Sequence, residues 1–513
     1  MTRRLTGTLG VALLLLAVHP ALVSAQSDGA ARKAKSRSLA ERIDKIIDKG
    51  LQEAKIKPSP RAELAQLTRR LHIDLVGRIP TVVQLVDLID PTNDSPTKLE
   101  DRIDELLASD SYAYNFSHFW RSVMLRGTNQ QQAGPRSQFE GWLRARLASN
   151  TRYDQLAREL LINQPGPPGA TPAAFYTLNG NKAETLAGAT ARVFLGIKLE
   201  CAECHPHPFA KWTRKQFWEF AAFFSNAQSG GGKQIKIPQT DKVVQAKFIT
   251  GEAPDWAKNN TPRTTLADWT TATQNPYFAK AAVDHVWQYF FGVSLMEAIL
   301  EPTEDSPPAH AELLDELAKG FIDSGFDLKF LIRSIVLTDA YQRQSVPLRE
   351  ATKVEIQMFA RMPVRGMTPE QLFDCVGVAT EYRDNAVASN PNRARQLGQA
   401  QNAARTQFLA MFNSQDRSTE TYTSILQALF LMNGQFMAER SREAVKTIAV
   451  QDTSTQRRVE ALYMLVLSRL PRASEMERMV RYIENGGGSG DPRQAVGDVC
   501  WVLLNSSEFM LNH

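Results

Sequence analysis

The 513-residue chain is poor in cysteine, in net charge and in long apolar runs, and each shortage excludes a class of protein. Four cysteines cannot form the dense disulfide framework of small secreted domains. A formal net charge of +5 is too small to argue for a nucleic-acid partner, and we expect none. Beyond the N-terminus no stretch is apolar enough to span a bilayer, so we expect no transmembrane segment once the leader described below is cleaved.

The sequence also lacks the short motifs of several large enzyme classes. It contains no Gly-x-Ser-x-Gly, no His-Glu-x-x-His, no Walker sequence and no Cys-x-Pro/Ala-x-Arg run of the sulfatase type. The run from Gly230 to Lys233 is not a phosphate loop, because the full spacing and the preceding buried strand are missing. Motifs therefore predict no reaction, and whether the chain is an enzyme stays open.

What is present is the composition of a globular protein, with 43% hydrophobic and 22% charged residues. The length exceeds that of one ordinary core. Apolar residues recur at helical spacing along most of the chain, and Ile235, Ile237, Val243 and Val244 indicate short strands. The prediction is a mostly α protein. Two helical modules, 38–227 and 263–513, are joined by a linker, 228–262, that contains a small β-hairpin.

The N-terminus predicts export. Arg3 and Arg4 precede an apolar run over residues 9–18, and residues 23–25 (VSA) resemble a cleavage site. We expect a signal peptide over 1–25, a disordered lead-in over 26–37 and a first helix capped by Ser38. A retained N-terminal anchor is the alternative. The expected location is periplasmic or extracellular.

Other helix starts are indicated by local capping signals. Thr81, Asp327 and the pair Thr368-Pro369 each precede an apolar helical pattern. Asn275-Pro276 reads as a cap followed by a first-turn proline. These residues predict where helices begin.

The chemistry of the chain is concentrated in the run Cys201-Ala-Glu-Cys204-His205-Pro-His207, on a connector between two predicted helices. Cys-x-x-Cys-His is the attachment signature of haem c. In that interpretation Cys201 and Cys204 bind the haem vinyl groups and His205 ligates the iron. Four residues are candidates for the second axial ligand, none with distinctive spacing: Met124, Met296, His118 and His285.

Two other interpretations of the run stay open. Cys201, Cys204, His205 and His207 together form a set of sulfur and nitrogen donors that suits zinc or iron. A plain Cys201–Cys204 disulfide is also compatible with an oxidising compartment. The remaining thiols, Cys375 and Cys500, lie in apolar helical patterns and are predicted to be buried, with a long-range disulfide between them as the alternative.

These blocks of sequence resemble a family of exported proteins from Planctomycetes and related bacteria. In that family a planctomycete cytochrome-c-like module (domain of unknown function 1549) is followed by domain of unknown function 1553. The first module is matched by residues 69–81 (RRLHIDLVGRIPT), 193–212 and 221–224 (AAFF). The second is matched by residues 266–269 (LADW), 275–279 (NPYFA), 286–287, 290–292, 327–333 and 504–509 (LNSSEF). This chain has Asp284-His285 where the family usually has Asn-Arg, and Ala210 where it usually has Asp.

The resemblance implies cytochrome-like behaviour without a defined reaction. Together with the motif it leads us to expect an exported c-type haem protein with a redox or electron-transfer role and a redox partner protein. The alternative is a non-redox exported binding or structural protein, linked to polysaccharide breakdown, whose motif holds a metal ion or a disulfide. The sequence does not indicate an oligomeric state.

Overall fold

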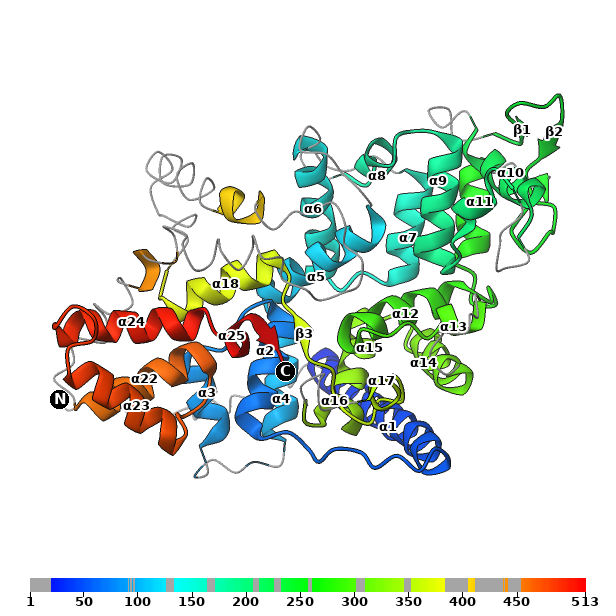
Figure 1. Cartoon of the computed structure of the whole chain (residues 1–513). Helices are drawn as coiled ribbons and strands as arrows, with labels where there is room; N and C mark the ends of the chain where they lie inside the picture. The colour runs from blue at the N-terminus through cyan, green and yellow to red at the C-terminus, as the bar shows by residue number, and fades with distance from the viewer. Residues whose placement is uncertain are drawn as a thin grey trace, which may run out of the picture.

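The computed structural model describes residues 20–90, 92, 95, 97–125, 133–163, 171–205, 212–225, 232–256, 261–300, 310–345, 352–382, 405–410, 437, 439–441 and 454–513. The protein is mostly helical, as predicted (Figure 1). Within the described residues the only sheets are two pairs of short strands. One pair is the predicted hairpin, in which β1 (Gln234–Lys236) lies antiparallel to β2 (Val243–Gln245).

The first half of the chain contains ten α-helices and three short helices of other types among the described residues. They are α1 (Pro20–Glu53), α2 (Leu64–Val76), α3 (Val82–Ile89), α4 (Lys98–Ala108), α5 (Asp110–Met124), α6 (Ala133–Ala148), α7 (Tyr153–Ile162), α8 (Ala174–Leu178), α9 (Ala183–Thr190), the π-helix η2 (Ala191–Leu195), the 3-10 helix η3 (Leu199–Ala202), α10 (Arg214–Ala221) and the 3-10 helix η4 (Ala222–Phe224).

The second half is also helical. Its elements are α11 (Pro262–Thr270), α12 (Phe278–Phe291), α13 (Glu297–Leu300), α14 (Ala311–Asp323), α15 (Leu328–Val336), α16 (Asp339–Gln342), α17 (Lys353–Gln357), β3 (Arg365–Gly366), α18 (Pro369–Ala379), α22 (Thr455–Leu467), α23 (Ala473–Glu484), α24 (Pro492–Leu504), α25 (Ser507–Met510) and β4 (Leu511–Asn512).

Local capping chemistry fixes several helix starts as predicted. Thr81, Asp327 and Thr368 each accept a hydrogen bond from the backbone N–H three residues later, at the starts of α3, α15 and α18. Asn275 accepts bonds from the N–H groups of Tyr277 and Phe278, so it caps a turn just before α12 begins.

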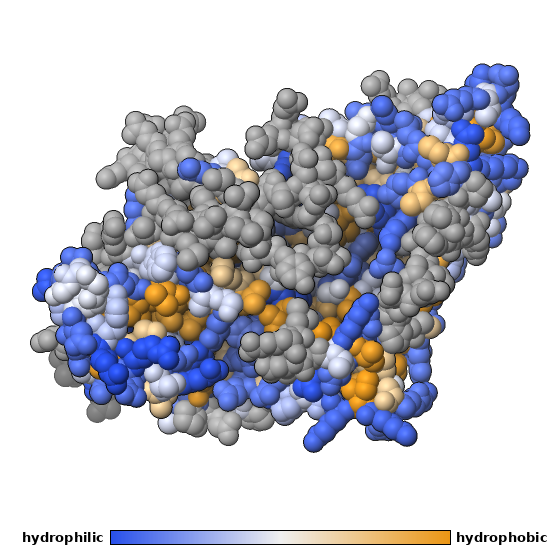
Figure 2. All heavy atoms as spheres, in the orientation of Figure 1, coloured by the Kyte–Doolittle hydropathy of each residue, from blue (hydrophilic) through white to orange (hydrophobic). Residues whose placement is uncertain are grey.

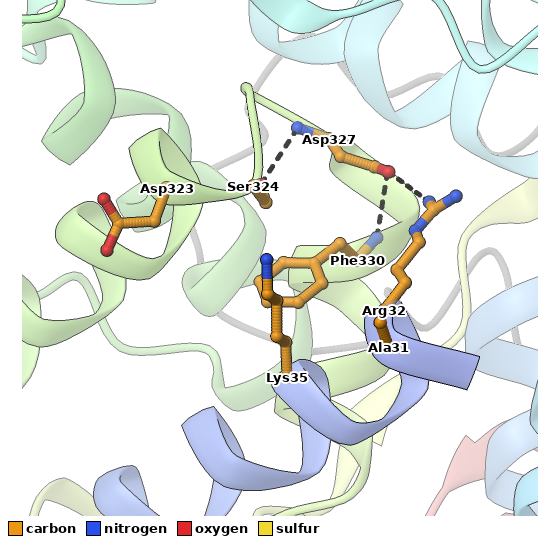
Figure 3. A pocket seen from close by; sticks show the side chains of 7 residues that line it. All are labelled: Ala31, Arg32, Lys35, Asp323, Ser324, Asp327 and Phe330. Carbon is orange, nitrogen blue, oxygen red and sulfur yellow. Dashed lines mark hydrogen bonds and ion pairs between the residues drawn. The ribbon is translucent and has the colours of Figure 1, made fainter. Parts of the chain in front are cut away.

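The expectation of a disordered lead-in over 26–37 and a helix start at Ser38 is wrong, because α1 continues through both. The reason is long-range docking. Arg32 pairs with Asp327 beside a cavity of about 280 Å³ between α1 and the α14–α15 turn (Figure 3). Arg37 pairs with Glu100 at 2.6 Å, and the buried Ser36 Oγ accepts a 2.6 Å hydrogen bond from Arg333. Contacts with distant acidic residues hold a segment whose own composition favours disorder.

The main hydrophobic core crosses the boundary between the two predicted modules. It runs from Leu39 on α1 to Met362, and rings from the two halves meet inside it. Phe116 lies 5.3 Å from Tyr289, and Tyr153 lies 5.3 Å from Phe278, measured between ring centroids. The first hundred residues of the second predicted module therefore pack with the first. The boundaries 38–227, 228–262 and 263–513 stay predictions.

A second core surrounds α18, α22 and α24, and a buried polar network ties it to α2. Asp74 on α2 is 1% exposed and accepts two 2.9 Å bonds from Arg365 and one 2.7 Å bond from Asn512. Arg365 and Asn512 face each other in the β3–β4 pair. Arg69, also on α2, donates to the backbone carbonyls of Val466 and Phe509. The C-terminal end of the chain is thereby fastened beside α2 (Figure 1).

On the face drawn in Figure 2, small apolar patches are scattered among hydrophilic side chains, and the β1–β2 end is mostly hydrophilic. Among the described residues, no helix combines the length and the apolar character needed to cross a membrane.

Candidate functional site

The Cys201–His205 run lies on the connector between α9 and α10, at the end of the molecule that carries the β1–β2 hairpin (Figure 1). The helix that leads to it widens into the π-helix η2 and stops at Gly196, which has a left-handed backbone with φ of +67°. Single π-turns inside helices are frequent at functional sites. After Ile197 and Lys198 the chain enters η3, and the motif begins inside this short helix.

The two motif thiols lie three residues apart, in and just after this short helix. Cys201 lies in η3, and Glu203 keeps helical dihedral angles after η3 ends. Side chains three residues apart overlie each other in 3-10 geometry. Cys201 and Cys204 are both exposed free thiols. Both thiols are therefore open to solvent.

The backbone beneath these thiols is held from α9 and α10. The carbonyl of Glu203 accepts hydrogen bonds from Arg214 Nε and Trp218 Nε1, each 3.2 Å long. Glu200 pairs with Arg192 and lies against Gly188, where a β-carbon would come within 2.6 Å of Glu200 Cγ. The motif thus combines a restrained backbone with accessible side chains.

His205 differs from the other described histidines in its exposure to solvent. His205 is the one exposed histidine among them, and the rest are buried or partly buried. Burial lowers the pKa of His72, His118 and His513 to about 4, and it also lowers the pKa of His285 and His310. An exposed imidazole that follows two exposed thiols in the chain suits ligation. In the five other described histidines, burial favours the neutral form of the ring.

The four candidates for a second axial ligand are buried or partly buried. His285 donates through Nε2 to the carbonyl of Val193, 3.0 Å away. His118 contacts Arg121. Met124 is fully buried in the main core, and Met296 packs against Gly196, just before the motif. The structure brings His285 and Met296 to the segment that precedes Cys201, and each already has a packing or hydrogen-bonding role there.

The two non-haem interpretations find different degrees of support. Within the part of the chain that the structure describes, no three His, Cys, Asp or Glu side chains converge as a metal site would need. His207, the fourth donor of the predicted metal set, lies outside the described residues. Cys201 and Cys204 carry free thiols, so the predicted disulfide is not formed in this structure. None of these observations assigns a cofactor.

The other two thiols behave as predicted. Cys375 and Cys500 are fully buried in the second core. Burial raises the pKa of each to about 12, so neither is a reactive thiolate at neutral pH. The chemistry of accessible cysteine is confined to the motif.

Sequence reasoning missed a buried ion cluster between α5, α6 and α18. Arg121 donates to Glu140 at 2.5 Å and to Glu370 at 3.0 Å. Against the cost of burial, Arg121 lowers the pKa of Glu370 to about 2. These residues are 19 and 249 positions from Arg121, and no local pattern marks them as partners.

The fold and the site together define a mostly helical protein with a Cys-x-x-Cys-His motif on a restrained surface connector. Residues 42–229 match PSCyt2, described as a protein of unknown function (DUF1549). Residues 262–483 match PSD1, described as a protein of unknown function (DUF1553). The chain therefore belongs to the family in which these two modules follow each other, which confirms the resemblance seen in the sequence. No curated protein and no solved structure matches it.

Proposed function

We propose that the protein is an exported c-type haem protein with a redox or electron-transfer role. The observation that carries this proposal is the arrangement of Cys201, Cys204 and His205: two exposed thiols three residues apart on a surface connector, followed at once by the one exposed histidine of the described chain. The name PSCyt2 of the first module points to cytochrome-like character without defining it. The N-terminal leader pattern supports export, because haem is attached to such motifs outside the cytoplasm.

The residues present fit the needs of haem attachment. Cys201 and Cys204 would form the two thioether bonds, and His205 would ligate the iron from one face. A bound haem supplies one-electron chemistry, and the chain supplies its anchorage and orientation. A redox partner protein would then exchange electrons with it at the exposed surface around the motif.

The test is expression of the full chain, with its leader, in a bacterial host that has the haem c maturation system. We expect a red product whose Soret band remains with the polypeptide after denaturation and whose motif peptide carries one haem by mass spectrometry. The variant Cys201→Ala/Cys204→Ala should be colourless. The matched control is Cys375→Ala/Cys500→Ala, which removes two buried thiols and should leave the haem content unchanged.

A colourless wild-type product from that host would contradict the proposal. Elemental analysis would then distinguish zinc or iron from an empty site, and the peptide masses would show whether Cys201 and Cys204 form a disulfide. Either of those outcomes would favour the non-redox alternative, an exported binding or structural protein.

A further inference from the structure

The segment that leads into the motif, residues 191–198, is held by the second module. We call it the approach segment. Inside it the N–H groups of Gly196 and Ile197 both bond to the carbonyl of Ala191, which closes the π-turn. The carbonyl of Val193 accepts a 3.0 Å hydrogen bond from Nε2 of His285, on α12. An imidazole from the second half of the chain therefore supports the turn that precedes Cys201.

Two further contacts join the approach segment to the loop after α12. Met296 fits against Gly196 because glycine has no side chain; a β-carbon there would lie 2.8 Å from both Cε and Sδ of Met296. Lys198 Nζ lies 2.7 Å from Glu297 Oε1, in a pair with both side chains about half exposed. The approach segment is thus contacted at three points along its length, Val193, Gly196 and Lys198.

Asp284, the neighbour of His285, orders the loop that makes the second and third contacts. Its carboxylate is 7% exposed and accepts bonds from Ser294 Oγ at 2.9 Å and from the N–H groups of Leu295 and Met296. These donors lie immediately before Glu297, where α13 begins. Removing the acceptor would leave buried donors unsatisfied and free the loop.

We propose that Asp284 and His285 are positioning residues, through which the second module fixes the orientation of the motif thiols. The first module holds the motif itself, because Arg214 and Trp218 donate hydrogen bonds to the carbonyl of Glu203. Contacts from both modules therefore support the motif and the segment before it. The inference rests on the proposed function because it concerns the same site. The contacts themselves do not depend on haem, so their effect on the two thiols can be tested separately.

The geometry of the two thiols can be measured without haem. The full-length protein, produced in a host without the haem c maturation system and then reduced, is equilibrated with oxidised glutathione, which takes two electrons and two protons from Cys201 and Cys204 to give the protein disulfide and two molecules of reduced glutathione. The equilibrium constant reports how well the two sulfur atoms are placed relative to each other. A thiol-alkylating reagent added to each variant checks the fold, because Cys375 and Cys500 are buried and react only if the protein unfolds.

We expect His285→Leu to change this equilibrium constant about threefold to tenfold, the range expected for the loss of one buried hydrogen bond. His310→Leu is the matched control, because His310 also donates through Nε2 to a backbone carbonyl, that of Gln357, at 3.0 Å. Its loss should leave the constant unchanged. His285→Gln, which keeps a donor, should restore part of the wild-type value.

The exposed pair Lys198–Glu297 gives a second test that does not depend on a buried substitution. Lys198→Glu should shift the constant in the same direction as His285→Leu, and Lys198→Glu/Glu297→Lys should restore it. If His285→Leu and Lys198→Glu both stay within about twofold of wild type, the inference is overturned. If Cys375 and Cys500 become alkylated in His285→Leu, that variant has unfolded, and the Lys198 variants alone test the inference. If the variants shift the equilibrium constant as expected but the wild-type protein takes up no haem, the proposed function is overturned and this inference stands.

Discussion

At the scale of single residues, Asp44 on α1 shows how burial and hydrogen bonding oppose each other. Its carboxylate accepts bonds from the N–H groups of Asp339 and Ala340 at the start of α16, 2.9 and 3.3 Å long. Burial is the largest effect and, with the nearby Asp339 carboxylate, raises the pKa of Asp44 from 3.8 to about 6, although both bonds and Arg343 act the other way. The folded protein holds this proton more tightly than the unfolded chain does. The stability from this proton is therefore fully present below about pH 4 and is lost as the pH rises to about 6.

Asp44→Asn should therefore stabilise the protein at neutral pH. The amide keeps an oxygen acceptor for α16 and removes a charge that the fold disfavours. Allowing for partial solvent screening, we expect the free energy of unfolding to rise by about 1 kcal/mol at pH 7.5 and to change little at pH 4. Urea unfolding at the two pH values measures this.

The matched control is Asp48→Asn, on the same helix, where the carboxylate pairs with Arg343 at 2.8 Å. That variant loses an attraction and should not gain stability at pH 7.5. An equal gain for Asp44→Asn at both pH values would show that its charge is not the cause.

At this same scale, the sequence predicts what is local and misses what is distant. The caps at Thr81, Asp327 and Thr368 could be predicted because the donor and the acceptor are three residues apart. The role of Asp44 could not, because its partners are 295 and 296 residues away. Burial decides its pKa, and burial is a property of the packed fold.

At the scale of elements, the residues 69–81 that marked the family in the sequence join α2 to the β3–β4 pair. Asp74 is the centre of this junction, with Arg365 and Asn512 from the paired strands and Tyr341 Oη at 2.8 Å. A two-residue strand pair has little stability of its own. The ion pair and its hydrogen bonds are what hold these strands against the helix.

Asp74→Ala should be among the most destabilising single substitutions in the chain. It leaves the guanidinium of Arg365, whose side chain is only 16% exposed, without its counter-charge. Breaking one side of a buried pair costs about 3–5 kcal/mol. Chemical denaturation measures the loss of free energy of unfolding. Hydrogen exchange should show the largest loss of protection at β3 and β4.

Asp87→Ala is the surface counterpart. Asp87 pairs with Arg102 at 2.6 Å, but its side chain is 54% exposed, so the loss should stay below about 1 kcal/mol. If Asp74→Ala costs no more than Asp87→Ala, then the buried network contributes nothing beyond an ordinary surface pair, and this account of residues 69–81 is wrong.

The elements also show where prediction from composition fails. The residues 26–37 are small, polar and basic, and such a segment is disordered when it stands alone. In the structure the basic side chains of α1 meet acidic side chains of α4, of α14 and of the residue that caps α15, namely Glu100, Glu316 and Asp327. The helix depends on partners that no local pattern could identify. The motif connector, in contrast, was predicted correctly as a link between two helices.

At the scale of the whole molecule, the main core unites segments that the family matches divide. The family modules cover residues 42–229 and 262–483, yet α5 and α7 of the first pack their rings against α12 of the second. Ile73 and Ile79, from the first module, lie in the second core. The family matches divide the chain into two consecutive stretches, whereas each hydrophobic core contains residues from both stretches.

Residues 38–227 expressed alone should therefore not reach a native fold. Separation from residues 228–513 would expose the faces of α5 and α7 that meet Tyr289 and Phe278, and it would remove the partners of Asp74. We expect helical far-ultraviolet circular dichroism with weak near-ultraviolet signal and no cooperative thermal transition. Co-expression of 38–227 and 228–513 as separate chains is the control, because the two should associate and recover the cooperative transition of the full chain. A sharp transition of 38–227 alone would show that the first module carries its own sufficient core, and the support of the motif by α12 would then be an addition to a domain that folds without it.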